Sequence, residues 1–507
     1  MITNALDKPL ASPMALRSHG VGATVSILMA ALLTSACATL PAATPARIAR
    51  APDAYATAQT LPASETAAWP ADTWWKAYGD AQLDGLIDEA LAGNPTLAQA
   101  EARLRRAQAL ANQAKAAELP SASANGSAER AKQSYNNGIP ADFVPQGYNN
   151  YGRLSLDFAW ELDFWGKNRA AVAAATSEAR AAQADAAQAR LMLSTSVASA
   201  YADLARLYAE RDVAERSVAL RLETEALVRD RVANGLDTRG ELRQAEAGAP
   251  NARAELAAVD EQIAQTRNGL AALLGAGPDR GLAITRPSVA ALKPFGLPSN
   301  LAADLIGRRP DVVAAKWRAE AASKRIGQAK AAFYPNINLA AGIGVQALHL
   351  NDLFDNGSDI GSVGPAISLP IFEGGKLRAN LRGKSADLDA AVESYNATVI
   401  DAVRDAADQV TSAQSITRQQ AEQRAAQTAA EGAYDIAVQR YRAGLGNYLN
   451  VLTAETAVLA QRRLAVDLAA RALDTQVGLA RALGGGWQPP TTATASASAS
   501  APSAPLN

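Results

Sequence analysis

The chain has 507 residues and carries 49 basic residues against 50 acidic ones, so its net charge is close to zero. This balance gives no electrostatic sign of a nucleic-acid partner, which would require a basic surface. The single cysteine excludes an intrachain disulfide, and the two histidines leave little material for a histidine-based zinc site or catalytic triad. Aromatic residues make up only 5% of this alanine-rich chain, a composition typical of long helices packed at close range.

Residues 1–36 are predicted to form a signal peptide. The apolar run "VGATVSILMAALLTSAC" ends in small residues, as secretory signals do, and is too short for a convincing membrane anchor. The sequence leaves open whether translation begins at Met1 or at Met14. Because "LLTSAC" resembles a bacterial lipobox, we expect Cys37 to become the first mature residue and to carry a covalent lipid; the alternative is a buried free thiol. Ala38 after the cysteine indicates sorting to the outer membrane.

The two ends of the mature chain show no helical or strand periodicity. Residues 37–73 are rich in alanine and proline and are predicted to form an extended arm. Residues 486–507 are dominated by alanine, serine and proline, and this tail is predicted to be disordered.

The first half of the folded chain, residues 74–293, is predicted to contain a helix, two strands at about 119–131 and 151–164, and a helical hairpin at 167–275. The stretch "LSLDFAWELDF" alternates strictly, which predicts a strand with one apolar face. It is long enough to cross a bilayer, and aromatic residues gather at its end as in a membrane-interface girdle. A half-buried sheet in a soluble protein is the alternative. The residues expected to face lipid are Leu154, Leu156, Phe158, Trp160 and Leu162.

The predicted hairpin is unusually long. Between Gly166 and Gly235 there is neither a glycine nor a proline, and roughly 68 helical residues extend for about 100 Å at 1.5 Å per residue. The chain then turns at "ANGLDTRG" and returns as a second helix. Pro250 in that returning helix removes a backbone donor and crowds the preceding turn, so we expect a local distortion there.

The second half, residues 294–485, repeats the first. One gapless register pairs Pro95 with Pro310, and another pairs Gly166 with Gly375. The two registers differ by six residues, so the first copy has the longer loop between its strands. The second copy is predicted to have strands at about 334–347 and 361–372 and a helical hairpin at 376–484.

Two strands per repeat give four per chain, which is too few for a closed barrel, since small barrels need about eight. Open sheet edges are not tolerated in a bilayer, where each unpaired backbone group costs several kcal/mol. We therefore predict a mixed α and β membrane protein whose barrel is shared between chains. Such a protein is an obligate homo-oligomer.

Several stretches resemble one family. The segment Gly296–Gly344, together with "PIFEGGKLRANL" and "RYRAGLGNYLNVLTAE", is similar to the outer-membrane efflux proteins, or TolC-like outer-membrane factors, and within them to the NodT-type lipoproteins of drug-efflux systems. The resemblance implies a homotrimer with a shared twelve-stranded transmembrane barrel and a long periplasmic helical barrel. It also implies a Gram-negative outer membrane, no enzymatic activity, and no cofactor besides the lipid on Cys37. The implied partners are a periplasmic adaptor, an inner-membrane transporter of the proton-driven RND type, and outer-membrane lipid.

The resemblance also assigns roles to residues near the two hairpin turns. In the family these tips contact the adaptor, although Gly235 and Gly444 also suit a turn without any partner. The expected docking residues are Arg231, Gly235, Leu236, Arg440, Gly444 and Leu445.

A periplasmic gate is expected just beyond the second tip. Leu449 matches a hydrophobic ring of the family, whereas Asn450 and Thr453 stand where relatives place aspartate. Asp237 and Glu241 near the first tip are either a remaining acidic ring or solvated turn charges. This pattern predicts a hydrophobic gate with little fixed negative charge.

Other functions remain open at this stage. A duct for type I protein secretion is the rival within the same class, because the cargo cannot be read from a tunnel lining. A lipid-anchored periplasmic coiled-coil spacer without a pore is the rival from another class. The row of apolar strand residues disfavours the spacer, and the sequence has no phosphate loop, nucleophile elbow or metal-spaced cluster that would indicate an enzyme.

Overall fold

The structure is a computed structural model, and it describes residues 47–50, 54–57, 59–61, 69–288 and 307–489. The predicted signal peptide, Cys37 and most of the predicted C-terminal tail lie outside these residues. The described chain forms two compact units. The first consists of Gln113–Ala173 and Ser323–Asp387, and the second contains the remaining described residues.

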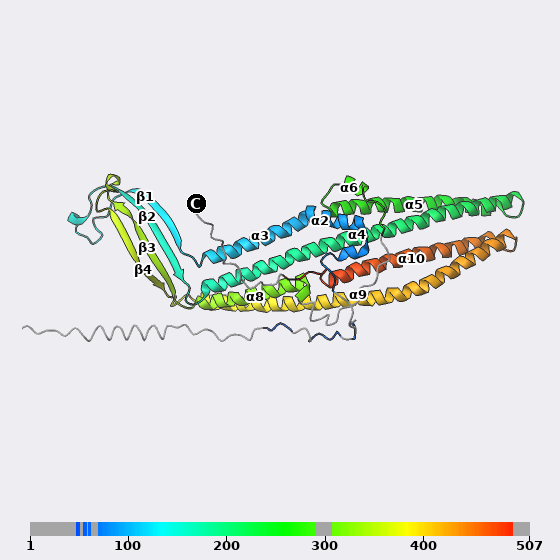
Figure 1. Cartoon of the computed structure of the whole chain (residues 1–507). Helices are drawn as coiled ribbons and strands as arrows, with labels where there is room; N and C mark the ends of the chain where they lie inside the picture. Colours follow the sequence, from blue (N-terminus) through cyan, green and yellow to red (C-terminus); the bar gives the residue numbers. More distant parts are fainter. Residues whose placement is uncertain (1–46, 51–53, 58, 62–68, 289–306, 490–507) are drawn as a thin grey trace, which may run out of the picture. The chain divides into compact units, whose positions relative to one another are not determined.

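The first unit contains a four-stranded antiparallel sheet in the order β1-β2-β3-β4 (Figure 1). Two strands come from each repeat. The last strand ends at Ser368, four residues before its predicted end. The strands are β1 (Ser121–Ala131), β2 (Asn149–Leu162), β3 (Asn336–Ala347) and β4 (Asp359–Ser368).

One face of this sheet is apolar and exposed, and the residues predicted to face lipid lie on it. Leu154 and Leu156 are 45% and 50% exposed, Phe158 and Trp160 are each 37% exposed, and Leu162 is partly buried. A large contiguous apolar surface marks a site of contact with a membrane or another protein.

The other face of the sheet is polar. Asp157 on β2 accepts hydrogen bonds from Asn125 Nδ2 on β1 at 2.7 Å and from Ser155 Oγ at 2.9 Å. Gly342 lies opposite Asp157 on β3, and a Cβ there would come within 3.0 Å of the carboxylate. The alternation predicted from the sequence therefore separates an apolar face from a hydrogen-bonded polar one.

Helices make up the second unit and extend into the first. The two long hairpins match in length: the outgoing helices have 67 residues each and the returning helices 35 each, as duplication requires. The helices are η2 (Trp74–Tyr78), α2 (Ala81–Gly93), α3 (Pro95–Ala116), α4 (Lys167–Ala233), α5 (Arg239–Leu273), α6 (Asp279–Leu282), α8 (Pro310–Ala331), α9 (Lys376–Arg442) and α10 (Tyr448–Ala482). Short 3₁₀ turns lie at η3 (Ala141–Phe143) and η4 (Leu350–Asp352) in the loops between strands.

The main core of the second unit packs η2 and α2 against α4, α5 and α10. Trp75 and Leu83 are almost fully buried there. Beside them the buried Asp80 caps α2 and accepts a hydrogen bond from Tyr201 Oη on α4 at 2.7 Å and from Ser288 N at 3.0 Å. One carboxylate therefore ties α2 both to α4 and to the segment that follows α6.

The duplication is also visible in how each hairpin closes. Asn94, just before Pro95, donates from Nδ2 to the carbonyl of Leu273 at 2.8 Å. Arg309 occupies the equivalent place before α8, and its Nη1 donates to the carbonyl of Ala482 at 3.4 Å. In each repeat, the residue that precedes the proline therefore fixes the end of the returning helix.

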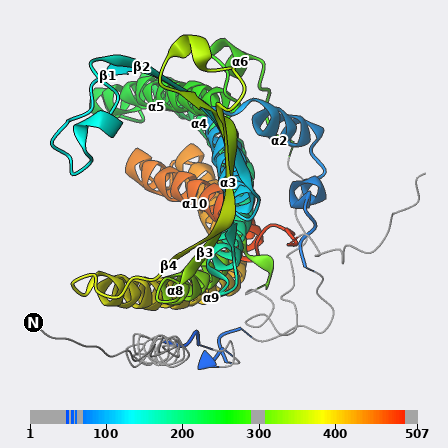
Figure 2. The ribbon, with the colours of Figure 1, turned by 90° about the vertical axis from the view of Figure 1, so that its left-hand side faces the viewer.

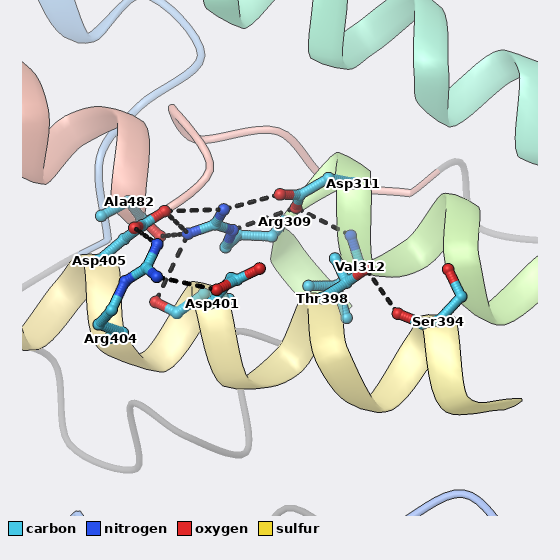
Figure 3. A network of polar contacts seen from close by, with 10 residues as sticks. Arg309, Asp311, Val312, Ser394, Thr398, Asp401, Arg404, Asp405 and Ala482 are labelled. Atoms are coloured by element: carbon cyan, nitrogen blue, oxygen red, sulfur yellow. Dashed lines mark hydrogen bonds and ion pairs between the residues drawn. The ribbon is translucent and has the colours of Figure 1, made fainter.

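The second repeat adds charges at this point (Figure 3). Arg309 Nη2 lies 2.7 Å from Asp311 Oδ2, and Nη1 lies 3.4 Å from Asp405 Oδ2 on α9. Burial alone would lower the pKa of Arg309, but the hydrogen bonds and charges of these two carboxylates raise it above its usual value. Arg309 therefore joins α8, α9 and α10, whereas Asn94 makes a single neutral contact with its hairpin.

Parts of the predicted N-terminal arm lie along α9. Arg47 N donates to Asp389 Oδ1 at 2.9 Å, and Arg50 N donates to Asn396 Oδ1 at 3.0 Å. Further along, Leu61 is buried in a cluster with residues of α9 and α10. The described part of the arm thus follows α9 in the direction of the chain and includes a turn in which Thr60 N and Leu61 N bond to the carbonyl of Thr57.

One expectation needs correction. The predicted disordered tail begins too early, because Gly486 and Trp487 are part of the fold and Trp487 packs against a cluster that contains Val313. At Pro250, where a local distortion is expected, α5 is not broken and continues from Arg239 to Leu273, with Pro250 exposed on its surface. Among the described helices, none is both long and apolar enough to span a membrane.

Candidate gate and docking site at the hairpin ends

The two hairpins turn in the same way. α4 ends with Gly235 at φ +70°, and the N–H of Leu236 bonds to the carbonyl of Arg231 at 2.8 Å. α9 ends with Gly444 at φ +75°, and Leu445 N bonds to the carbonyl of Arg440 at 2.8 Å. Both are Schellman motifs, in which glycine adopts the left-handed conformation that other residues avoid.

The leucine after each of these glycines is exposed. Leu236 is 62% exposed and Leu445 is 69% exposed, so each tip presents one large apolar side chain. Arg440 is also exposed, and its Nη2 lies 3.4 Å from the carbonyl of Leu445. Gly235 and Gly444 are exposed as well, so five of the six residues predicted to dock an adaptor lie at the surface.

Arg231 and Asp237, which the sequence assigned to two different sites, lie together and join the two hairpins. Arg231 Nε is 2.9 Å from Asp237 Oδ2, and both side chains are nearly buried. Arg231 Nη1 also donates to the carbonyl of Tyr441 on α9 at 2.8 Å, and its guanidinium carbon lies 4.4 Å from the centre of the Tyr441 ring. The Tyr441 hydroxyl donates a short hydrogen bond to Asp237. Burial and this bond raise the pKa of Tyr441, so its hydroxyl stays protonated.

An apolar cluster lies beside this polar link. Its buried members are Val228 on α4, Ala245 on α5, Tyr441 on α9, and Tyr448 and Val451 on α10. All four long helices therefore contribute to one contact zone next to the tips.

A buried ion pair connects the same hairpins further from the tips. Arg221 Nε on α4 lies 3.2 Å from Glu455 Oε1 on α10, and the Glu455 side chain is only 2% exposed. The two atoms are close but not aligned for a hydrogen bond. Arg221 Nη1 instead donates to the carbonyl of Gly248 on α5 at 3.2 Å. Burial raises the pKa of Glu455, and Arg221 only partly offsets this effect.

The predicted gate residues lie on the side of α10 opposite to the buried Val451 and Glu455. Leu449 is 60% exposed, and Asn450 and Thr453 are exposed beside it. Thr453 Oγ1 donates back to the carbonyl of Leu449 at 2.8 Å, so its hydroxyl is engaged within the helix. Seen along the helices, α10 lies on the inner side of the arc that α4, α5 and α9 form (Figure 2).

Glu241 has a local role. Its carboxylate accepts a hydrogen bond from Thr238 N at 2.8 Å, while Thr238 Oγ1 accepts one from Glu241 N at 3.3 Å. This capping box fixes the start of α5. Asp237 and Glu241 are thus both engaged by groups of their own chain.

Known proteins with the same features identify the chain's family. The family model described as outer membrane efflux protein matches residues 86–276 and 301–485, which together cover most of the chain and both repeats. The chain belongs to the outer membrane efflux protein family. It is an outer-membrane efflux channel, a class of transport proteins rather than of enzymes.

Individual relatives agree with this assignment. The fusaric acid resistance protein FusA of Burkholderia cepacia is 40% identical over 71% of this chain and 69% of its own length. The multidrug resistance outer membrane protein MdtP of Escherichia coli is 33% identical over 83% of this chain and 87% of its own length. The solved outer membrane protein VceC of Vibrio cholerae is 44% identical, with a TM-score of 0.78 over 82% of this chain and 99% of its own.

Sequence reasoning missed Tyr441 and the Arg221–Glu455 pair. A signal for Glu455 was present, because it falls in the apolar spacing that Tyr448, Val451 and Val458 follow along α10. An acidic residue in such a row predicts a buried partner. Nothing along the sequence pointed to Tyr441, whose contacts depend on how closely the two hairpins approach. In the part of the chain that the structure describes, no group of three or more acidic, histidine or cysteine side chains could hold a metal ion.

Proposed function

We propose that three copies of the chain form one duct, with a shared twelve-stranded barrel in the outer membrane and a helical barrel in the periplasm. The observation that carries this proposal is the sheet itself: four strands with β1 and β4 unpaired at its edges and one exposed apolar face. Unpaired edges are not stable in lipid, and joining β4 of one copy to β1 of the next removes them. A pore-less periplasmic spacer would have no use for such a sheet.

The proposed duct is the exit of a tripartite pump for drugs or other small toxic compounds. Its partners are a periplasmic adaptor and an inner-membrane transporter of the proton-driven type. The names of the relatives support this cargo class, since they refer to fusaric acid resistance and multidrug resistance. A duct for type I protein secretion is the second candidate. Export assays separate the two: loss of the gene raises the intracellular level of a small fluorescent drug in the first case and retains a secreted protein in the second.

We assign adaptor docking to the exposed leucines at the hairpin tips. Leu236 and Leu445 are large, exposed and not needed for the turn itself, whereas the glycines beside them are. Leu236→Asp and Leu445→Asp should abolish drug export while the protein still reaches the membrane as a trimer. Normal export by the double variant would refute this assignment. Leu282→Asp, at an exposed leucine of α6 away from the tips and the gate, is the matched control.

We assign the gate to Leu449, with Asn450 and Thr453 at its side. The 60% exposure of Leu449 argues against packing within one chain and fits a ring in which three leucines meet. Such a ring closes a pore by excluding water. The neighbouring amide and hydroxyl carry no charge, and Asp237 is already paired with Arg231, so little fixed negative charge is available to concentrate cations.

We propose that Cys37 carries the lipid anchor. Only nine residues lie between it and Arg47, which bonds to Asp389, and the ten Cα–Cα steps span at most about 35 Å. Asp389 lies thirteen residues into α9, about 20 Å from its start. The linker is therefore long enough to bring the lipid level with the first turn of α9, where the strands end. Mass spectrometry of the mature protein should find acyl chains on Cys37, and an unmodified residue upstream of it would refute the assignment.

A further inference from the structure

A cavity of about 550 Å³ opens in the second unit, away from the hairpin ends. It lies between three segments that are far apart in the sequence. The side chains and backbone that give it its chemistry belong to Trp69, Asp72, Arg308, Gly486, Trp487 and Gln488. Its size falls within the range of about 300–1,000 Å³ typical of small-ligand sites.

Glycines allow the backbone segments that form the walls of this cavity to approach closely. Gly484 and Gly486 both have positive φ, at +82° and +78°. A Cβ on Gly484 would lie 2.2 Å from the carbonyl oxygen of Arg308, and a Cβ on Gly486 would lie 2.2 Å from the carbonyl carbon of Ala71. The C-terminal segment can touch both other segments only because these side chains are absent. The cavity is therefore preformed by the backbone.

Each indole in the cavity packs against a hydrophobic cluster. Trp69 packs against the cluster that contains Leu61 and Leu483, and Trp487 packs against the cluster that contains Val313. Both rings are partly exposed, so each also has surface toward the cavity. Fixed aromatic surfaces of this kind contribute contact area with little loss of side-chain entropy on binding.

The polar groups of the cavity have mixed charge. The guanidinium carbon of Arg308 lies 4.9 Å from the centre of the Trp69 ring, and within the described chain Arg308 forms no ion pair. Asp72 and Gln488 are exposed at the rim. A free guanidinium next to an indole selects a ligand that offers a carboxylate, which it can bind through two parallel hydrogen bonds. A cationic ligand is disfavoured, because a cation already occupies the Trp69 ring.

We propose that this cavity binds an N-acetylated amino-sugar glycan with a free lactyl carboxylate, the chemistry of peptide-free strands of the bacterial cell wall. The C–H faces of a pyranose ring stack on an indole, the carboxylate pairs with Arg308, and Asp72 and Gln488 bond to hydroxyl and N-acetyl groups. A channel that extends from the outer membrane into the periplasm meets such a glycan. This binding is a second activity, separate from export, and it holds the duct in place relative to the wall.

The test uses the purified full-length protein and two soluble disaccharides. One is N-acetylglucosaminyl-N-acetylmuramic acid, which carries a lactyl carboxylate, and the other is di-N-acetylchitobiose, which lacks it. Calorimetry should show binding of the first with at least tenfold higher affinity than the second. Trp487→Ala and Arg308→Gln should each weaken binding of the carboxylated sugar at least tenfold. Trp165→Ala, which removes an exposed indole from the sheet unit, is the control and should leave binding unchanged.

Two further variants guard against a trivial loss of fold. Trp487→Phe keeps an aromatic surface and should retain most of the affinity. Arg308→Lys keeps the positive charge without the planar fork and should retain part of the affinity that Arg308→Gln loses. Failure of both sugars to bind would overturn the proposal, as would unchanged affinity in Trp487→Ala. Equal binding of the two sugars, with no effect of Arg308→Gln, would overturn the assignment of the carboxylate. Because no transport is measured, these outcomes are independent of whether the protein exports drugs.

Discussion

Tyr441→Phe isolates the polar link between the two hairpins. The change removes the hydroxyl that donates to Asp237 but keeps the ring that lies 4.4 Å from the Arg231 guanidinium. Asp237 is only 7% exposed at its side chain, so solvent cannot readily replace the lost donor. A hydrogen bond to a charged group contributes about 1.5–3 kcal/mol. This corresponds to a factor of about 10 to 150 per chain in the equilibrium between linked and separated hairpins.

Single-channel recording in a planar bilayer measures this shift. We expect Tyr441→Phe to raise the fraction of time that the channel is open. Tyr448→Phe is the matched control, because Tyr448 lies in the same apolar cluster with its ring centre 6.4 Å from that of Tyr441, and no described group accepts from its hydroxyl. If Tyr441→Phe leaves gating unchanged, or if Tyr448→Phe has the same effect, the link does not hold the hairpins closed.

Three further predictions concern stability and selectivity. Because burial raises the pKa of Glu455, ionisation of this carboxyl costs the folded chain stability as pH rises above the usual carboxyl range. The melting temperature of Glu455→Gln should therefore rise relative to that of the wild type with increasing pH, and a pH-independent difference would contradict this. Arg309→Met leaves Asp311 without its cation and leaves Asp405 with Arg404 alone. It should cost more in the free energy of unfolding, measured by denaturant titration, than the about 1–3 kcal/mol expected for Asn94→Ala; an equal loss in both would refute the role of the charges. Thr453→Asp should strengthen cation preference in reversal-potential measurements without changing pore width, and an unchanged reversal potential would exclude Thr453 from the pore lining.

Much of the architecture could be predicted because it follows from local patterns. The alternation around Leu156 and Phe158 gave the strand and its apolar face, and the long stretch without glycine or proline before Gly235 gave α4. Because the second half repeats the first, the same two elements could be predicted there. These features depend on side-chain periodicity and backbone propensity, which the sequence states directly.

The contacts between hairpins could not be predicted, because they depend on which faces of separate helices meet. Arg231 and Asp237 are six residues apart, and each side chain could have pointed to solvent. In the structure they pair with each other, and both also contact Tyr441 of the other hairpin. Pro250 illustrates the effect of the surroundings on a local preference. A proline on the exposed side of a long, packed helix leaves the unpaired carbonyl of the preceding turn accessible to water, so α5 continues through Pro250 without a break.

The cavity between Trp69 and Trp487 was missed for a related reason. Its C-terminal wall lies in a segment that was predicted to be disordered from composition alone. The run of glycines before Trp487 lies at the end of the helical hairpin predicted at 376–484. It also permits two backbone segments to approach, a property that appears only once the partner segment is in place.

The central claim is that this chain forms a gated outer-membrane duct, and the conductance of the purified protein in a planar bilayer tests it most directly. The account predicts discrete channel openings that are infrequent in the wild type and weakly cation-selective. It also predicts that Leu449→Ala raises the conductance with little change in selectivity. Absence of discrete channels from trimeric protein, or an unchanged conductance in Leu449→Ala, would contradict the account.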